Sequence, residues 1–242
     1  MVTGKSGYSA SKARKLIAAR AAVRKAATAL RGRTTSYPRA PLRTGGFYGG
    51  YYKRGREELK TVDVDGVSGT ITSAGAITLL NGIPQGTDYT ERIGRKVLLR
   101  SVLWRGFVTP SSATSLPEGA FFRYIIFYDS QTNATTPLVG DVLATNAYDA
   151  PLNLTNRDRF KVLVDKFCTI NATTYTTGAL SAGSPMPKHL KYYKKMMMEV
   201  IFGSTGSTVG SIQTGGLFLL TICSVNVGCK LDMYSRVRFT DS

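Results

Sequence analysis

Hydrophobic and polar residues alternate with a period of two near the end of the chain. In the stretch LDMYSRVRFT (231–240), every second residue is apolar except Ser235, and the residues between them are polar, aromatic or charged. This alternation is typical of a strand with one buried face. Two other stretches, 120–130 and 215–224, are apolar on both sides, which indicates central strands. In all, the pattern predicts eight strands, at 58–65, 69–80, 95–109, 120–130, 159–170, 189–202, 215–224 and 231–240.

The connections between these strands are rich in turn residues and contain little helix. Segments 110–119 and 203–216 carry the Gly, Pro, Ser and Thr residues that end regular structure. One short helix is predicted, at about Pro137–Ala144. Eight strands with long loops predict an all-β protein, and a single eight-stranded jelly-roll sandwich is the leading candidate.

The first 56 residues follow a different pattern. Ser9–Arg31 is rich in Ala, Lys and Arg, which favour a helix, but its apolar stripe of Leu16, Val23 and Leu30 is too narrow to stabilise a helix alone. We expect it to order only against nucleic acid or neighbouring subunits, with a membrane-surface helix as the alternative. Residues 32–56 are a linker in which aromatics alternate with cations, a mixture suited to binding single strands. The alternative is that the last aromatics of this linker contact the first strand.

Charge separates the same two regions. The chain holds 32 Lys and Arg against 15 Asp and Glu, a net charge of +17, and fourteen of the basic residues precede the first acid, Glu57. The sequence therefore predicts a basic, largely flexible arm at 1–56 and a jelly-roll domain at 57–242. An arm of this kind neutralises phosphates without sequence preference. The predicted nucleic-acid-binding residues are Lys12, Arg14, Lys15, Arg20, Arg24, Lys25, Arg31, Arg33, Arg39, Arg43, Lys53, Arg54 and Arg56.

The chain offers no pattern that predicts catalysis. His189 is the sole histidine, and three cysteines without CxxC spacing (Cys168, Cys223 and Cys229) argue against a zinc site or a disulfide framework. We expect them to be small core residues. No cofactor is expected, although calcium between subunits stays open as an alternative to ordinary ion pairs for five loosely clustered acids. These are Asp129, Asp141, Asp149, Asp158 and Asp165.

A second basic cluster, KHLKYYKK at Lys188–Lys195, has two interpretations. Continued as a strand, it would turn Lys191, Tyr193, Lys195 and Glu199 to one side, with Lys194 as an exception on the apolar side. This outward side is either a surface facing nucleic acid or an ordinary solvated strand face. No apolar run is long enough to span a membrane, and we expect no membrane partner.

Several segments resemble a known group of proteins. Besides the basic arm and Gly/Tyr linker, they are RKVLLRSVLWRGFV (95–108), FRYIIFYD (122–129) with PLVGDVL (137–143), and NLTNRDRFKVLVD (153–165). They resemble the capsid proteins of small circular single-stranded DNA viruses that encode a replication protein, and their relatives among small plant viruses and satellites.

The resemblance implies a jelly roll whose copies form an icosahedral shell, most simply a T=1 shell of sixty. The arm would face a single-stranded DNA genome, with RNA as the open alternative, and would act as a nuclear localisation signal for host import receptors. The protein would then be found in the virion, and in the host nucleus during assembly. The competing hypothesis is a monomeric, basic-tailed nucleic-acid-binding module or chaperone of cellular origin. An enzyme is not expected.

Overall fold

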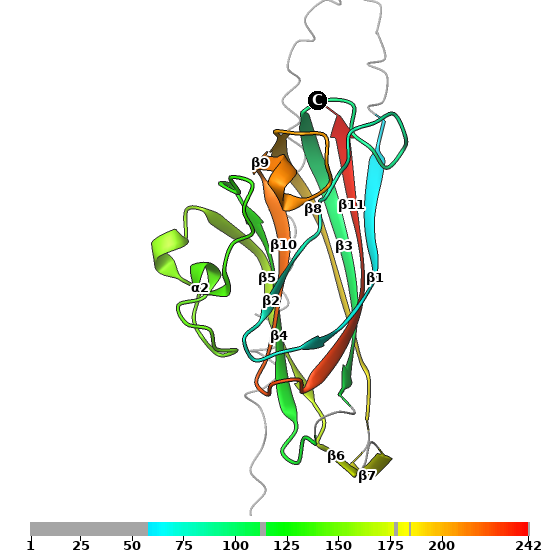
Figure 1. Cartoon of the computed structure of the whole chain (residues 1–242), viewed down its shortest axis with the longest axis vertical. Helices are drawn as coiled ribbons and strands as arrows, with labels where there is room; N and C mark the ends of the chain where they lie inside the picture. Colours follow the sequence, from blue (N-terminus) through cyan, green and yellow to red (C-terminus); the bar gives the residue numbers. More distant parts are fainter. Residues whose placement is uncertain (1–57, 112–114, 177–178, 184, 242) are drawn as a thin grey trace, which may run out of the picture. The chain divides into compact units, whose positions relative to one another are not determined.

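The computed structural model describes residues 58–241, apart from 112–114, 177–178 and 184. Within this part the chain forms two main antiparallel sheets that face each other (Figure 1). The first sheet has the strand order β1-β11-β3-β8-β9, and the second has the order β2-β10-β4-β5. The strands of the first sheet are β1 (Lys60–Ile71), β11 (Cys229–Asp241), β3 (Lys96–Pro110), β8 (Lys188–Phe202) and β9 (Ile212–Thr214). Those of the second are β2 (Ala76–Leu79), β10 (Gly216–Cys223), β4 (Ala120–Asp129) and β5 (Phe160–Ile170).

The connectivity is that of a jelly roll. The chain crosses from one sheet to the other between β1 and β2, β2 and β3, β3 and β4, and again between β10 and β11, whereas β4 and β5 pair within the second sheet. Eight strands, four from each sheet, make the sandwich, which confirms the predicted fold class. Three short strands were not predicted: β9, and the hairpin of β6 (Thr173–Thr176) and β7 (Ala179–Gly183).

The main core lies between the two sheets and follows from the alternation in their strands. In β11 the apolar residues of the period-two pattern are buried, and Ser235 is buried among them, as predicted. In β3 every second residue from Val102 to Val108 is also buried. Trp104 of β3 stacks on Tyr124 of β4 with ring centroids 4.7 Å apart, so the two sheets meet through aromatic packing as well as aliphatic contacts.

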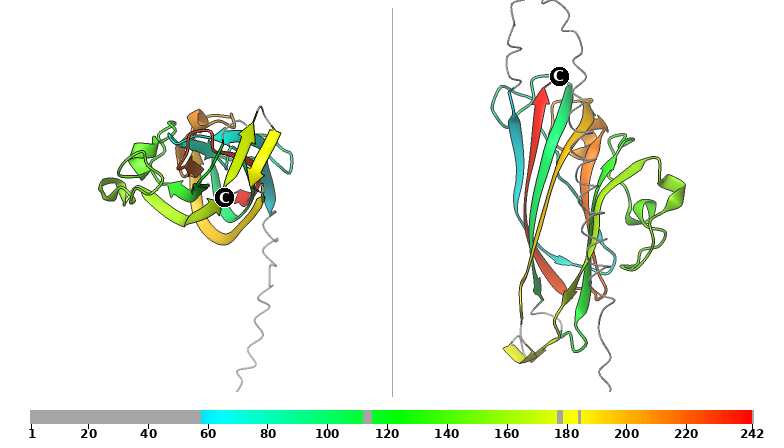
Figure 2. Two further views of the ribbon diagram at one scale, coloured as in Figure 1. Left: turned by 90° about the horizontal axis from the view of Figure 1, so that it is seen from below. Right: turned by 180° about the vertical axis from the view of Figure 1, so that it is seen from behind.

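A separate layer covers the outward side of the second sheet. Residues 130–159 leave β4, form the short helix α2 (Val139–Val142) and the 3-10 turn η1 (Leu154–Asn156), and return to β5. Figures 1 and 2 show this segment against the second sheet, on the side away from the first sheet. It encloses a second apolar cluster built around Phe127, Phe218 and Phe160. Here β4 and β10 are buried on both faces, as the sequence predicted for central strands.

The structure corrects the boundaries of the first two strands. The sequence predicted separate strands at 58–65 and 69–80, but β1 runs without interruption from Lys60 to Ile71. Gly66 takes a positive φ of 62°, and the pairing with β11 shifts its register between Val64 and Val67. The glycine therefore makes a bulge within one strand instead of a turn between two strands. Among the described residues, none of the helices has the length and apolar character needed to cross a bilayer.

Candidate nucleic-acid interface

The thirteen residues predicted to bind nucleic acid all lie between Lys12 and Arg56, outside the described residues. Their role stays a prediction. The same holds for the predicted helix at Ser9–Arg31 and for the aromatic linker after it. The described part of the chain nevertheless carries a second basic surface, which can be examined residue by residue.

This surface is the outward side of the first sheet, which none of the described residues covers as 130–159 covers the second sheet. The alternation that buries one side of β11, β3 and β8 sends polar, cationic and aromatic side chains to the other. We call this surface the open face. It consists of Arg100, Arg105, Phe107, His189, Lys191, Tyr193, Lys195, Lys230, Asp232, Tyr234, Arg236 and Arg238.

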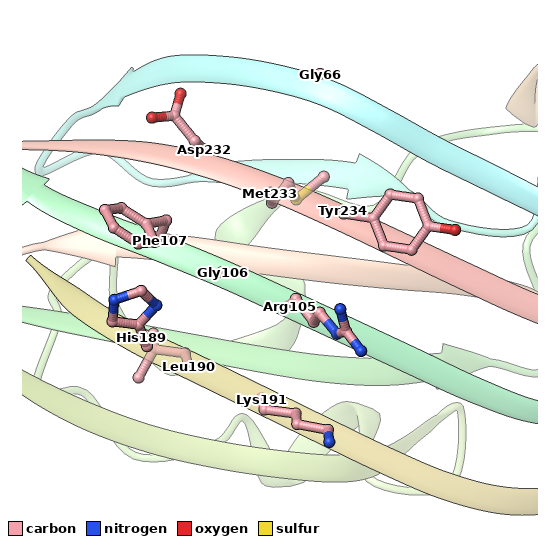
Figure 3. Close-up of a pocket in the computed structure, with 10 residues that line it drawn as sticks. All are labelled: Gly66, Arg105, Gly106, Phe107, His189, Leu190, Lys191, Asp232, Met233 and Tyr234. Atoms are coloured by element: carbon pink, nitrogen blue, oxygen red, sulfur yellow. The ribbon is translucent and has the colours of Figure 1, made fainter.

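A hollow of about 550 Å³ lies on the open face (Figure 3). Its floor is the backbone around Gly106 of β3 and its neighbours on β8 and β11. One side of the hollow is a row of three residues from adjacent strands: Tyr234 lies directly opposite Arg105, and Arg105 lies directly opposite Lys191. Figure 3 shows these side chains reaching out from β11, β3 and β8. Two cations therefore face each other on neighbouring strands.

The opposite side of this hollow holds two rings and the carboxylate of Asp232, which lies opposite Phe107 on β11. Phe107 and His189 are directly opposite each other in the ladder, and their rings meet edge to face with centroids 4.2 Å apart. His189, the sole histidine of the sequence, therefore contacts an aromatic ring. The hollow thus has two cations along one row, and two rings with one carboxylate along the next.

A second hollow, of about 650 Å³, lies further along the same strands. Its lining includes Arg100, Lys195, Arg238 and Met197, together with Tyr193, whose residue surface is 52% exposed. Within the first sheet, Lys195 and Arg238 lie on either side of Ser101. Cationic and ring surfaces are therefore repeated along the open face.

Lys230 and Arg236 on the open face each have a carboxylate partner within the protein: Asp232 lies 3.9 Å from Lys230, and Asp63 pairs with Arg236. The guanidinium of Arg236 donates two hydrogen bonds to the carboxylate of Asp63, at 2.8 and 2.6 Å, and the hydroxyl of Tyr234 donates a third at 2.9 Å. The hydrogen bonds from Arg236 lower the pKa of Asp63, and the carboxylate in turn raises the pKa of Arg236. The carboxylate of Asp63 thus already occupies the site that an outside anion would take on Arg236.

Four cations of the open face differ from Arg236. No carboxylate among the described residues forms an ion pair with Arg105, Lys191, Lys195 or Arg238. Like charges placed directly opposite on adjacent strands destabilise a sheet. The pair of Arg105 and Lys191 therefore has a cost that a bound anion would relieve. Phosphate contacts from such cations, combined with stacking on exposed rings, are how proteins hold single-stranded nucleic acid.

Sequence reasoning found part of this surface. The prediction for Lys188–Lys195 is confirmed in its geometry: Lys191, Tyr193 and Lys195 face outward, and Lys194 is exposed although it lies opposite the buried Val102. Arg105 was missed because nothing in one strand reveals which residue lies opposite it on the next. Arg236 and Arg238 were visible in the alternation of 231–240, but their place beside β3 and β8 depends on the strand order.

Most of the loosely clustered acids serve the packing of the described chain. The buried carboxylate of Asp129 accepts two hydrogen bonds from Arg159, at 2.9 and 2.8 Å, and Asp165 accepts two from Arg123. Asp141 accepts a hydrogen bond from the backbone N–H of Leu138 at the start of α2. In the described part of the chain, no three His, Cys, Asp or Glu residues gather as metal ligands. Calcium held jointly by neighbouring copies stays a prediction.

Comparisons with known proteins agree with this architecture. The family model described as "Satellite tobacco necrosis virus coat protein" matches residues 55–242. The coat protein of Maize white line mosaic satellite virus is 25% identical over 174 residues, which cover 71% of this chain and 75% of that protein. The coat protein of Satellite tobacco necrosis virus 2 is 27% identical over 177 residues, which cover 71% of this chain and 80% of that protein.

Among solved structures, T=1 particles derived from infectious bursal virus align with 77% of this chain and 40% of theirs. The identity is 14% and the TM-score 0.15, so this likeness carries no argument. The family match, in contrast, spans the whole described domain. The chain therefore belongs to the satellite tobacco necrosis virus coat protein family.

Proposed function

We propose that this chain encloses single-stranded nucleic acid in its shell and holds it with two surfaces, the basic arm and the open face. Family membership makes the chain a structural viral coat protein that assembles with its own copies and is found in the virion. It is not an enzyme, and the alternative of a monomeric cellular binding module is set aside. The proposal concerns the identity of the enclosed nucleic acid and the surfaces of the protein that bind it.

The observation that carries the role of the open face is the direct opposition of Arg105 and Lys191 without a neutralising carboxylate. A strand face that only met solvent would gain by placing opposite charges there. Phosphates bridging the two cations would remove the repulsion and release condensed counterions. The adjacent exposed rings would add stacking that tolerates any base.

The arm supplies most of the charge in this proposal. It carries fourteen basic residues and no acid. In a T=1 shell of sixty copies, the arms would bring about 840 positive charges, enough for on the order of a thousand phosphates. Phosphate contacts of this kind position the cargo without reading its sequence.

The family match favours RNA as the cargo, because satellite viruses carry single-stranded RNA. The resemblance to circular DNA viruses pointed to DNA instead, and the comparisons give no support for that finer assignment. Import into the host nucleus through the arm rested on the same resemblance. It stays a prediction, as does the expected absence of a cofactor.

The test compares two matched pairs of exposed lysines on full-length protein. Lys191→Ala with Lys195→Ala removes cations from β8 on the open face, and Lys161→Ala with Lys166→Ala removes two from β5 in the second sheet. Binding of fluorescent single-stranded RNA is measured by anisotropy over a salt series. We expect the β8 pair to lower the slope of log affinity against log salt by about 1.4, at about 0.7 for each lost phosphate contact.

The β5 pair should leave that slope unchanged. Equal effects from both pairs would show that the open face has no special role. Deletion of 1–43 should weaken binding far more than either pair. If the deleted protein kept full affinity, the arm would not be the packaging element.

A further inference from the structure

Two of the three cysteines lie side by side where the chain crosses from one sheet to the other. Cys223 ends β10 and Cys229 begins β11. Their Sγ atoms are 2.8 Å apart, and their residue surfaces are only 1% and 0% exposed. Ordinary nonbonded contact between heavy atoms has an optimum near about 3.5–4.0 Å. Both thiols are buried, as predicted for small core residues, and they are closer than simple packing of such residues requires.

Both ends of the connecting turn are fixed by the backbone. The N–H of Ser224 donates to the carbonyl oxygen of Phe121 in the second sheet, at 2.8 Å. At the other end, the carbonyl oxygen of Gly228 accepts a hydrogen bond of 3.0 Å from Ser111, the residue that follows β3 in the first sheet. The two sulfur atoms are therefore held together by anchors on both layers.

The surroundings distinguish the two thiols chemically. Hydrogen bonding from Cys229 lowers the pKa of Cys223 to about 7, with further support from the backbone of Val225 and Ser224. The same contact, together with burial, raises the pKa of Cys229. The thiolate is the reactive form of cysteine, and attack by Cys223 with Cys229 as the resolving thiol gives the same disulfide as the reverse order.

The third cysteine is too far away to compete. Cys168 on β5 lies directly opposite Phe122 on β4, and Phe122 lies directly opposite Cys223 on β10. A whole strand thus separates the two cysteines, a spacing of about 9.6 Å at the usual distance between strands. A disulfide needs Cα atoms within about 7 Å of each other.

We propose that Cys223 and Cys229 are a site of oxidation to an intrachain disulfide by a peroxide. The Cys223 thiolate attacks one oxygen of hydrogen peroxide and the O–O bond breaks, which leaves a sulfenic acid and a hydroxide that is protonated to water. The sulfur of Cys229 then attacks Cys223 as the S–O bond breaks, and the Cys229 proton leaves with the departing oxygen as a second water. Two thiols are oxidised by two electrons in total, and one peroxide is reduced to two waters.

The bond would join the two layers of the sandwich. β10 lies between β2 and β4 in the second sheet, and β11 lies between β1 and β3 in the first. A covalent link at their junction restricts the unfolded chain and so stabilises the folded domain. The inference does not depend on what the shell contains.

Peptide mapping of the full-length wild-type protein tests the proposal. The protein is treated with hydrogen peroxide under native conditions, remaining thiols are alkylated, and the digest is examined by mass spectrometry with and without reduction. We expect a linked pair of peptides containing Cys223 and Cys229, lighter by two hydrogen atoms than the reduced pair, while Cys168 is recovered alkylated. The midpoint of thermal unfolding should rise by about 5 °C and fall back on reduction.

A matched set of variants completes the test. Cys168→Ser should keep both the link and the shift in unfolding midpoint, whereas Cys229→Ser should lose both and leave Cys223 free to oxidise further. The proposal is overturned if the wild-type protein yields a link that includes Cys168. Recovery of Cys223 and Cys229 as alkylated thiols after oxidation of Cys168 would overturn it as well.

Discussion

The two sheets of the sandwich send opposite kinds of side chain outward, although their strands share the same alternation. The outward side of the second sheet presents Phe127 and Phe218, which are fully buried beneath residues 130–159. The outward side of the first sheet presents Arg105 and Lys191, which are exposed. One face takes its own chain as a partner. The other carries exposed cations, which under the proposed function bind a polyanion.

Ion pairing follows the same division. Beside the covered face, each buried charge has a partner, as with Arg159 and Asp129 or Arg123 and Asp165. On the open face, four cations have no carboxylate partner among the described residues. A fold that lacked a polyanionic partner would have little reason to leave cations directly opposite each other. The comparison thus distinguishes charges that stabilise the domain from charges available for binding.

The largest expected effect comes from the covered face. Phe218→Ala removes a fully buried ring that stacks with Phe127 at a centroid distance of 5.6 Å. We expect a loss of about 3–5 kcal/mol in the free energy of unfolding, measured by urea denaturation. Tyr193→Ala on the open face is the control and should cost less than about 1 kcal/mol. Similar losses for both would remove the distinction between a covered and an open side.

A smaller loss is expected from an ion pair beneath the cover. Asp129→Ala leaves Arg159 without its partner, and the Arg159 side chain is 27% exposed, so water compensates part of the loss. We expect a destabilisation of about 2 kcal/mol in the same assay. Asp158→Ala breaks the exposed pair with Arg157 and should change stability by less than about 0.5 kcal/mol. A negligible effect of Asp129→Ala would mean that the pair has no stabilising role.

On the open face, removal of a charge should raise the free energy of unfolding instead of lowering it. Arg105→Ala removes one of two directly opposed cations, so the protein free of nucleic acid should gain about 0.2–0.5 kcal/mol of stability. The same variant should bind single-stranded RNA more weakly. Arg238 lies opposite the uncharged Ser101, so Arg238→Ala should weaken RNA binding without raising the free energy of unfolding. A loss of stability from Arg105→Ala would contradict the assignment of these cations to a partner.

The smallest effect concerns the neutralised corner of the open face. Because Arg236 lowers the pKa of Asp63 in the folded protein, the pair stabilises the fold above about pH 4, and this contribution is lost as the pH falls through the lowered pKa. Asp63→Asn should therefore reduce the unfolding midpoint slightly at pH 7, with a gap to the wild type that closes in acid. A gap that widened in acid would refute this linkage.

The predictability of the fold and of the open face differs for a physical reason. Alternation within one strand is local, so the burial pattern of 231–240 and the outward side of 188–195 could be predicted. Pairing between strands is not local. The opposition of Arg105 with Lys191 joins positions 86 residues apart, and the contact of Cys223 with Cys229 depends on a turn fixed from two sheets.

The cover over the second sheet was also beyond prediction. Residues 130–159 show neither period two nor a long helical stripe, and only the short helix near Pro137–Ala144 was expected. The observed α2 is shorter still, at Val139–Val142. This segment keeps its place through contacts with the apolar face beneath it, not through a strong local preference, so its sequence alone carries little signal.

The exposed ammonium of Lys194 has a consequence for how copies meet. Among the described strands, β8 pairs on its outer side only with β9, at Ile201 and Phe202, so most of its length is a free sheet edge. A strand from another molecule that extended the sheet there would have to bury this charge beside the apolar side of the ladder. At the other edge, the bulge at Gly66 interrupts the regular row of backbone groups. Both edges of the first sheet thus resist extension by a strand from another copy, and we expect contacts between copies to use other surfaces.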